Sequence, residues 1–338
     1  MMHVGKAIQI VEQGGQVTPG VGVSSSLPVP AIVAQSGDAV SEKFVEYFIA
    51  QLRNPNTRDV YRQAVRQFLE WCEAKGAGQL QDITFVAISA YIEQHPGAPT
   101  TIGVHLAAIR ELFNWLKQQG VLEKNPAENV RGPKYRIKEG KTPFLESQEM
   151  RQLLDSIDTS NVIGLRDRAL IALMTFTFSR ISATLKMDVE DYIQRGSTHL
   201  IRLHEKGGKD MGIPLHHTAN EYLHAYIEAA EAQEGIVWGK GTPLFRSQQH
   251  SRVYRLSDKR LLRGNAWSMV KRRGQDANLH IDICNHSFRA TGITNYLENG
   301  GSRDIAQDIA GHEDVRTTAL YDRRTNKATL DEVQRMRF

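Results

Sequence analysis

The chain has few cysteines and lacks a long uninterrupted apolar run. Its two cysteines, Cys72 and Cys284, lie far apart in unlike sequence contexts, which predicts neither a disulfide framework nor a cysteine-based metal site. The longest apolar stretch near the N-terminus, residues 21–33, is broken by serines and two prolines, so it predicts neither a membrane span nor a signal sequence. We therefore expect a soluble protein of a reducing, cytoplasmic compartment.

Excess charge is also small. A net charge of +4 over 338 residues does not by itself predict a polyanionic partner, so the placement of the basic residues matters more than their total. Residues 124–141 carry six lysines and arginines against two glutamates, and residues 245–274 carry nine against Asp258 alone. Each basic segment is either a solvated face or a contact with a phosphate backbone, and its charge alone does not decide between them.

Recognised metal-ligand spacings are missing as well. Five histidines lie on expected strands and turns without such a spacing, namely His199, His204, His216, His217 and His250. Gly207-Gly208 is expected to form a hairpin turn and not a phosphate loop. We expect no metal and no other cofactor.

Helical periodicity begins near residue 41. Residues 1–40 are rich in Gly, Ser, Val, Gln and Pro without a sustained period, which predicts a disordered tail or arm. An apolar stripe at Ile102, Leu106, Ile109, Phe113 and Leu116 marks the clearest helix of the next segment. Four helices are expected, over residues 42–53, 57–75, 84–94 and 100–120, forming a helical bundle domain over residues 41–123.

The segment 124–146 is expected to be a basic linker, because residues 125–143 contain three prolines and two glycines and show no apolar period. Residues 147–338 then form a second domain with helices and two short strands, 199–203 and 211–215. Its helices are expected at residues 147–157, 165–178, 217–232, 266–277, 286–298, 302–310, 316–323 and 329–336. The predicted fold is mainly α: an N-terminal helical bundle and an α+β domain with a small antiparallel sheet.

Several chemically useful residues are grouped in the second domain. His286 and Arg289 are three apart on an expected helix, so both project from one face. His312 follows Gly311, and Tyr321 comes nine residues later. Each of these has an ordinary structural interpretation when taken singly, but together they suit a site that holds a phosphodiester and attacks it with a phenol.

The motifs around these residues resemble those of the tyrosine recombinases, also called the phage integrase family. The resemblance lies in His286-Ser-Phe-Arg289-Ala-Thr-Gly, Gly311-His312 and Thr317-Thr-Ala-Leu-Tyr321. Upstream, Arg166-Asp-Arg-Ala-Leu and Phe178-Ser-Arg180-Ile-Ser182 resemble the first arginine box, and Glu205-Lys206-Gly-Gly-Lys209 resembles the hairpin lysine. The bundle over residues 41–123 is similar to the core-binding domain of that family, and residues 147–338 to its catalytic domain.

The resemblance implies a role for each residue. Arg180, Arg289 and His312 would bind the non-bridging oxygens of a DNA phosphate, because the paired hydrogen bonds of a guanidinium stabilise the negative charge that develops there. Tyr321 would be the nucleophile, and His286 would assist or accept its proton. Lys206, which fills the family's lysine position in preference to Lys209, would protonate the leaving 5′ oxygen.

The implied function is site-specific recombination through a 3′-phosphotyrosine intermediate without metal or ATP, as in the integration of mobile elements. Specific duplex DNA sites would be bound chiefly through phosphates, with one helix of the bundle and one near residues 266–277 in the major groove. The protein would be a bacterial-type cytoplasmic protein associated with the nucleoid. Its working unit would be a homotetramer on two DNA sites, assisted by accessory DNA-bending proteins. The helix after Tyr321 would dock on a neighbouring protomer.

Two other functions remain open. A type IB topoisomerase uses the same set of side chains but relaxes DNA instead of exchanging strands. A DNA-binding regulator on the same scaffold is the second alternative, because Ala183 stands where the family usually carries an acidic residue that holds the first arginine. The acidic residues Asp188, Glu190 and Asp191 are close in sequence and are candidates to replace it.

Overall fold

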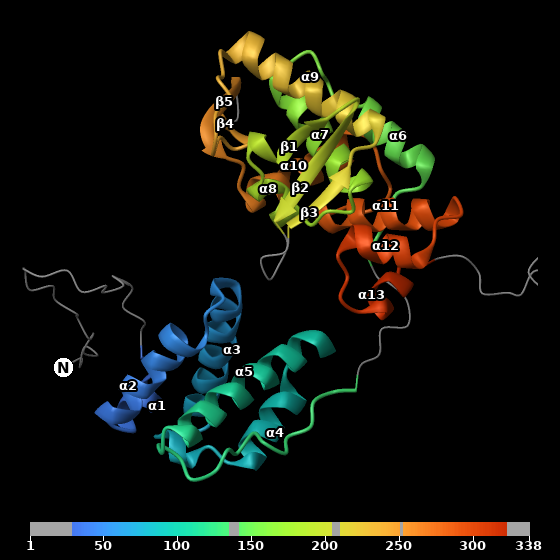
Figure 1. Ribbon diagram of the computed structural model, residues 1–338. Coiled ribbons are helices and arrows are strands. Elements are labelled where there is room, and N and C mark those ends of the chain that lie inside the picture. Colours follow the sequence, from blue (N-terminus) through green and yellow to red (C-terminus); the bar gives the residue numbers. More distant parts are fainter. Residues whose placement is uncertain (1–28, 135–141, 205–209, 251–252, 323–338) are drawn as a thin grey trace, which may run out of the picture. The chain divides into compact units, whose positions relative to one another are not determined.

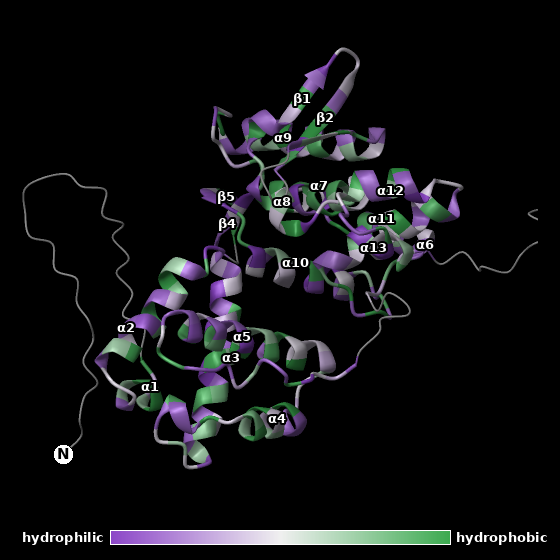
Figure 2. Ribbon diagram, turned by 60° about the horizontal axis from the view of Figure 1, so that its bottom comes forward, coloured by the Kyte–Doolittle hydropathy of each residue, from purple (hydrophilic) through white to green (hydrophobic). Residues whose placement is uncertain are grey.

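The computed structural model describes residues 29–134, 142–204, 210–250 and 253–322. Within these ranges, no helix is both long enough and apolar enough to span a membrane. The chain forms two compact units, residues 1–136 and 137–338, each with its own buried core. Figure 2 shows that helices of both units carry hydrophobic and hydrophilic residues in alternating patches, as amphipathic helices do.

The first unit is a helical bundle (Figure 1). Its helices are α1 (Ala31–Gln35), α2 (Asp38–Glu46) with a π-helical continuation (Tyr47–Gln51), α3 (Pro55–Ala74), α4 (Phe85–Gln94) and α5 (Pro99–Gln118). α3 begins sharply because the Asn54 side chain accepts hydrogen bonds from the amides of Asn56 and Thr57. α3 packs on α5, where the buried rings of Phe68 and Phe113 meet edge to face. The four helices expected in residues 42–120 are confirmed.

The expectation of a disordered tail up to residue 40 is wrong from residue 29 onward. Ile32 and Val33 of α1 are buried in the bundle core. The amide of Ile32 donates to Glu73 Oε1 at 2.8 Å, and the amide of Leu80 donates to Ser36 Oγ at 2.8 Å. A five-residue helix with two apolar anchors is too short to produce a visible period, which is why the sequence pattern missed it. Residues 1–28 lie outside the described residues.

The second unit is mostly helical with two small sheets. Its elements are α6 (Ser147–Asp155), α7 (Val162–Phe176), α8 (Ile181–Lys186), β1 (Tyr192–Arg195), β2 (Thr198–His204), β3 (Asp210–Pro214), α9 (His217–Glu234), β4 (Arg246–His250), β5 (Val253–Arg260), α10 (Arg263–Asp276), α11 (Asn285–Glu298), α12 (Arg303–Ala310) and α13 (Val315–Ala319). One sheet is antiparallel in the order β1-β2-β3, and β4 pairs with β5.

The predicted mainly helical fold with a small antiparallel sheet is confirmed, although the sequence pattern missed α8, β1, β4 and β5. α13 ends at Ala319, two residues before Tyr321, and not at residue 323. The helix expected over residues 329–336 lies outside the described residues. Strands β4 and β5 are largely polar, so they lack the apolar alternation by which strands are recognised in a sequence.

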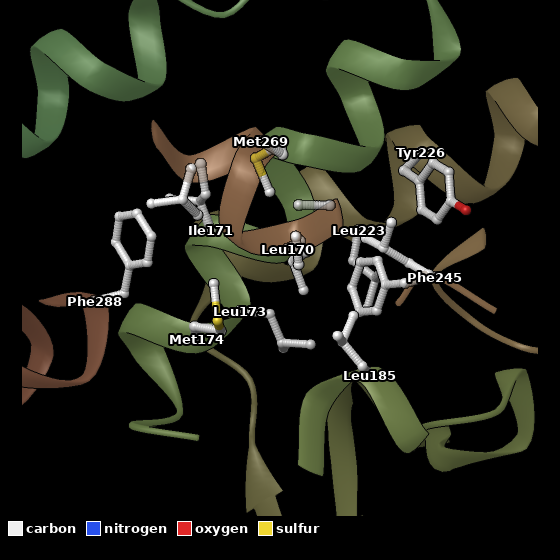
Figure 3. Packing of buried hydrophobic residues seen from close by; sticks show 14 of the residues in the cluster. Leu170, Ile171, Leu173, Met174, Leu185, Leu223, Tyr226, Phe245, Met269 and Phe288 are labelled. Atoms are coloured by element: carbon white, nitrogen blue, oxygen red, sulfur yellow. The ribbon is translucent and has the colours of Figure 1, made fainter. Parts of the chain in front are cut away.

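α7 forms the centre of the second unit, where it contacts both α9 and α11. Figure 3 shows its side chains Leu170 and Leu173 surrounded by side chains from neighbouring elements. α11 approaches α7 closely at Gly292, where a Cβ atom would lie 2.0 Å from the Thr175 carbonyl oxygen. This close approach brings the first turns of α11, which carry His286 and Arg289, to the end of α7. Phe178, two residues after the end of α7, begins the turn that leads to Arg180.

Candidate active site

Five of the six residues singled out in the sequence meet at the ends of four helices. Arg180 precedes α8, His286 and Arg289 lie in α11, His312 follows α12 and Tyr321 follows α13. We call these five residues the active-site cluster. The Tyr321 hydroxyl lies 3.0 Å from His286 Nε2, and Tyr321 is only 7% exposed.

Arg289 connects the elements that carry the cluster. Its side chain is buried, Nη2 donates to the carbonyl oxygen of Ala310 at 2.6 Å, and Nη1 donates to that of Phe178. Ala310 ends α12 just before His312, and Phe178 lies two residues before Arg180. Phe178 has a φ of 52°, a left-handed conformation that is uncommon for an aromatic residue and that turns the chain between α7 and α8. A single guanidinium thus links α11 to the segments that carry the other two phosphate-binding candidates.

His312 is held from several directions. It follows Gly311, whose left-handed conformation (φ 58°) ends α12. Its amide donates to the carbonyl of Gln307, and the Gln307 side-chain amide donates back to the His312 carbonyl at 3.0 Å. The ring lies parallel to that of Tyr321, with centroids 5.9 Å apart and an angle of 7° between the planes, and its Nδ1 lies 2.9 Å from Thr318 Oγ1.

Burial and nearby charge shift the pKa values of His286, His312 and Tyr321 in the cluster. Burial lowers the pKa of His286, and the positive charges of Arg289 and Arg180 lower it further. The same causes, with a contribution from His286, lower the pKa of His312 to about 3. Burial raises the pKa of Tyr321, although the charge and hydrogen bond of Arg289 and the charge of Arg180 act in the opposite direction. Both imidazoles are therefore neutral and the phenol is protonated at neutral pH.

Lys206, the sixth residue, lies outside the described residues. The strands that flank it are described up to the pair His204 and Asp210, which ends the β2–β3 ladder. His204 Nδ1 lies 2.7 Å from Asp210 Oδ1, and His204 Nε2 lies 3.2 Å from the buried Asp191. The β2–β3 hairpin expected around Gly207-Gly208 is confirmed for its paired strands.

The three acidic residues near Ala183 each have a hydrogen-bond partner in the structure. Asp188 pairs with Arg260, Asp191 with Arg202 and His204, and Glu190 accepts from the amide of Gly241. Ala183 itself is 5% exposed and belongs to the apolar core. The backbone at Arg180 is held by hydroxyl groups: Thr184 Oγ1 lies 3.1 Å from the Arg180 carbonyl oxygen and 2.7 Å from Ser179 Oγ.

Sequence reasoning missed three contacts that shape the cluster. Thr318 bonds to His312, Thr294 Oγ1 donates to the Tyr321 carbonyl at 3.2 Å, and the Phe178 carbonyl accepts from Arg289. Thr318 lies inside the Thr-Thr-Ala-Leu-Tyr motif, so its proximity to Tyr321 was visible in the sequence. No sequence signal identifies a backbone carbonyl as a partner. Among the described residues, no group of three or more His, Cys, Asp or Glu could hold a metal ion.

Two segments of the chain match known protein families. Residues 143–328 match the phage integrase family, and residues 42–120 match the phage integrase N-terminal SAM-like domain. Tyrosine recombinase XerD of Corynebacterium glutamicum is 28% identical over 277 residues, which cover 79% of this chain and 86% of that protein. Tyrosine recombinase XerD of Staphylococcus saprophyticus is 25% identical over 290 residues, covering 84% and 93%.

Solved structures share the fold. XerH site-specific recombinase bound to difH substrate superposes with a TM-score of 0.66 at 18% identity, covering 90% of this chain and 95% of that one. A lambda integrase dimer bound to a COC′ core site superposes with a TM-score of 0.62 at 18% identity, covering 85% and 96%. A lambda integrase tetramer bound to a Holliday junction gives a TM-score of 0.59 at 18% identity, covering 83% and 76%.

Proposed function

The chain belongs to the phage integrase family of enzymes that break and rejoin DNA. We propose that it is a site-specific recombinase acting through a 3′-phosphotyrosine intermediate. The observation that carries this proposal is the position of the Tyr321 hydroxyl, 3.0 Å from His286 Nε2 and under the electrostatic influence of Arg180 and Arg289. A phenol, two imidazoles and two guanidiniums form a set suited to a phosphodiester.

The two guanidiniums and His312 bind the scissile phosphate. Attack on phosphorus increases the negative charge on the non-bridging oxygens, and preorganised cationic donors stabilise that charge. The buried position of Arg289 supports this role, because a charge in a water-excluded site acts more strongly than one in solvent. Arg289 and His312 reach the phosphate from α11 and from the end of α12.

Proton transfer accompanies the exchange of bonds. The Tyr321 oxygen forms a bond to phosphorus as the bond to the 5′ oxygen breaks, and His286, a neutral imidazole, accepts the phenol proton. Lys206 protonates the 5′ oxygen. The phosphotyrosine bond conserves the energy of the phosphodiester, so a 5′ hydroxyl from another strand reverses the step without ATP or metal.

Duplex DNA with specific recombination sites is the proposed substrate, and a homotetramer on two sites is the proposed working unit. Similarity to recombinases solved on DNA, including a tetramer on a Holliday junction, supports both. We propose that residues 41–123 and residues 147–338 both bind the duplex, and that the basic linker 124–146 contacts its phosphates. α10 and one helix of the bundle read the major groove, and residues after Tyr321 dock on a neighbouring protomer.

A nicked suicide substrate, which loses its 5′ hydroxyl after cleavage, tests the chemistry. The wild type should accumulate a covalent adduct at the 3′ end of the cut strand, and Tyr321→Phe should form none while still binding DNA, because it lacks the nucleophilic oxygen. Tyr254→Phe, which removes an exposed phenol from β5, is the matched control and should cleave like the wild type. DNA binding without any wild-type adduct would favour a DNA-binding regulator.

The topoisomerase alternative needs a second assay. A recombinase joins strands from two different duplexes, whereas a type IB topoisomerase rejoins the strand that it cut. Incubating two short duplexes of different length that carry the cognate site should give products of exchanged length. Relaxation of supercoiled DNA without such products would exclude recombination.

A further inference from the structure

The Thr318 side chain is fully buried and faces His312. It is 0% exposed, and its Oγ1 lies 2.9 Å from His312 Nδ1. Among the described residues this is the one hydrogen bond of the Thr318 hydroxyl. α13 carries Thr318 three residues before Tyr321, and the Tyr321 amide donates to the Thr318 carbonyl at 3.0 Å. The helix that positions the nucleophile therefore also contacts a phosphate-binding candidate.

The burial of this hydroxyl decides the direction of the hydrogen bond. If His312 Nδ1 carried the proton and donated it to Oγ1, the hydroxyl hydrogen of Thr318 would be buried without an acceptor, which is unfavourable because a buried donor then loses its hydrogen bond to water without replacement. If the hydroxyl donates to an unprotonated Nδ1, both groups are satisfied. A neutral imidazole with an unprotonated Nδ1 carries its hydrogen on Nε2, and burial keeps this ring neutral by lowering its pKa to about 3.

We propose that Thr318 is a positioning residue that holds His312 in the tautomer with the proton on Nε2, so that the ring donates a hydrogen bond to a DNA phosphate oxygen. This inference rests on the proposed function. Thr318 occupies Nδ1, so Nε2 is the nitrogen left for the substrate. In the other tautomer Nε2 would present a lone pair to phosphate oxygens and repel them. Stacking against Tyr321 fixes the plane of the ring, and Thr318 fixes its protonation form.

The tautomer can be measured directly in the unmodified protein. Nitrogen-15 NMR of histidine-labelled protein distinguishes a protonated Nε2 from a protonated Nδ1, and His312→Gln assigns the signal. Wild-type His312 should show a protonated Nε2 at neutral pH. A protonated Nδ1 in the wild type would overturn the inference without need of any variant at Thr318.

Three variants test the consequence for cleavage. Thr318→Val replaces the hydroxyl with a methyl group of similar shape, so it should mix the two His312 tautomers. Suicide-substrate cleavage at saturating DNA should slow by about ten- to a hundredfold, the range that follows loss of a group that orients a metal-bound histidine. Thr318→Ser keeps a hydroxyl and should retain most of the rate and the wild-type nitrogen signal. Thr317→Val alters the neighbouring, partly exposed threonine and should change neither.

Failure of this inference differs from failure of the proposed function. Wild-type cleavage together with an unchanged His312 signal in Thr318→Val would overturn the inference alone, since Tyr321→Phe would still abolish the adduct. A wild-type protein that forms no adduct would overturn the proposed function, whatever the tautomer. A slow Thr318→Val variant whose His312 signal matches the wild type would also contradict the inference, because the loss would then be structural.

Discussion

His286 and His312 are both buried in the active-site cluster beside the guanidiniums of Arg180 and Arg289. Burial and the neighbouring positive charges both disfavour a charged imidazole, and each histidine has a lowered pKa. A neutral ring can still donate a hydrogen bond from one nitrogen and accept one at the other. In the proposed reaction, the arginines would therefore supply the positive charge, while the histidines would supply oriented donors and acceptors.

The lowered pKa of His312 makes the folded chain sensitive to acid. A histidine with a folded pKa of about 3 binds fewer protons than the same residue in the unfolded chain, where its pKa is about 6.5. Stability should therefore rise with pH through this window and fall as the pH drops below about 6.5. The melting temperature should therefore decrease as the pH is lowered from 7 to 5. The melting temperature of His312→Gln should decrease less steeply, because this variant lacks one group that takes up a proton on unfolding.

His280→Gln changes an exposed histidine and serves as the control for that series. Its melting temperature should follow the wild-type pH dependence. Equal slopes for His312→Gln and the wild type would mean that His312 does not titrate differently in the folded and unfolded chains. His286, His105 and His216 also have lowered pKa values, so part of the slope should remain in every single variant.

At the scale of elements, the approach of α11 to α7 sets the geometry of the cluster. Gly292 is the point of closest approach, and its missing side chain allows the contact. Arg289 lies one turn before Gly292 on α11, and its Nη1 donates to the Phe178 carbonyl beyond the end of α7. A change in the spacing of these two helices would therefore move Arg289 relative to Arg180.

Gly292→Ala should destabilise the second unit by about 1–3 kcal/mol or more, which is the usual range for overpacking. The added Cβ would lie 2.0 Å from the Thr175 carbonyl oxygen and 2.7 Å from the Phe178 ring, so the backbone must shift. Gly264→Ala in α10 is the matched control, because its Cβ would meet nothing within 4 Å, and it should be neutral or stabilising by about 0.5–1 kcal/mol. Denaturant titration measures both, and equal effects would contradict the close-packing argument.

At the scale of the whole molecule, the described residues form separate hydrophobic cores in the two units. The bundle core contains Phe113, which is 0% exposed and packs against Phe68. The core of the second unit is centred on α7 and includes Leu170. Since each unit buries its own apolar side chains, each has its own source of folding free energy.

Scanning calorimetry should therefore resolve two unfolding transitions. Phe113→Ala should lower the stability of the bundle by about 3–5 kcal/mol, the cost of removing a buried aromatic ring, and leave the transition of the second unit unchanged. Val86→Ala on α4 removes an apolar side chain that is 71% exposed, and it should move neither transition appreciably. One transition that shifts as a whole would show that the units unfold cooperatively.

Local patterns predicted the helices that have a long apolar stripe. α3 and α5 are 20 residues each, and their boundaries follow from caps and prolines that act within a few residues. The short helix α1 was missed because its stability comes from partners distant in sequence, such as Glu73 for Ile32, 41 residues away. Strands β4 and β5 were missed because they are largely polar and lack an apolar alternation. The buried Ala183 was visible as a departure from the family pattern, but the hydroxyls that tie the Arg180 loop were not.

The sequence by itself determined which side chains are available: two arginines, two histidines, a lysine and a tyrosine at spacings that resemble one family, because motif spacing and helical period are local properties. Only the tertiary structure decided how five of them meet. Arg289 reaches a carbonyl 111 residues away, and Thr318 closes a buried hydrogen bond on His312. Burial and through-space distance set the pKa values and the tautomer in this cluster, and both depend on how the helices pack.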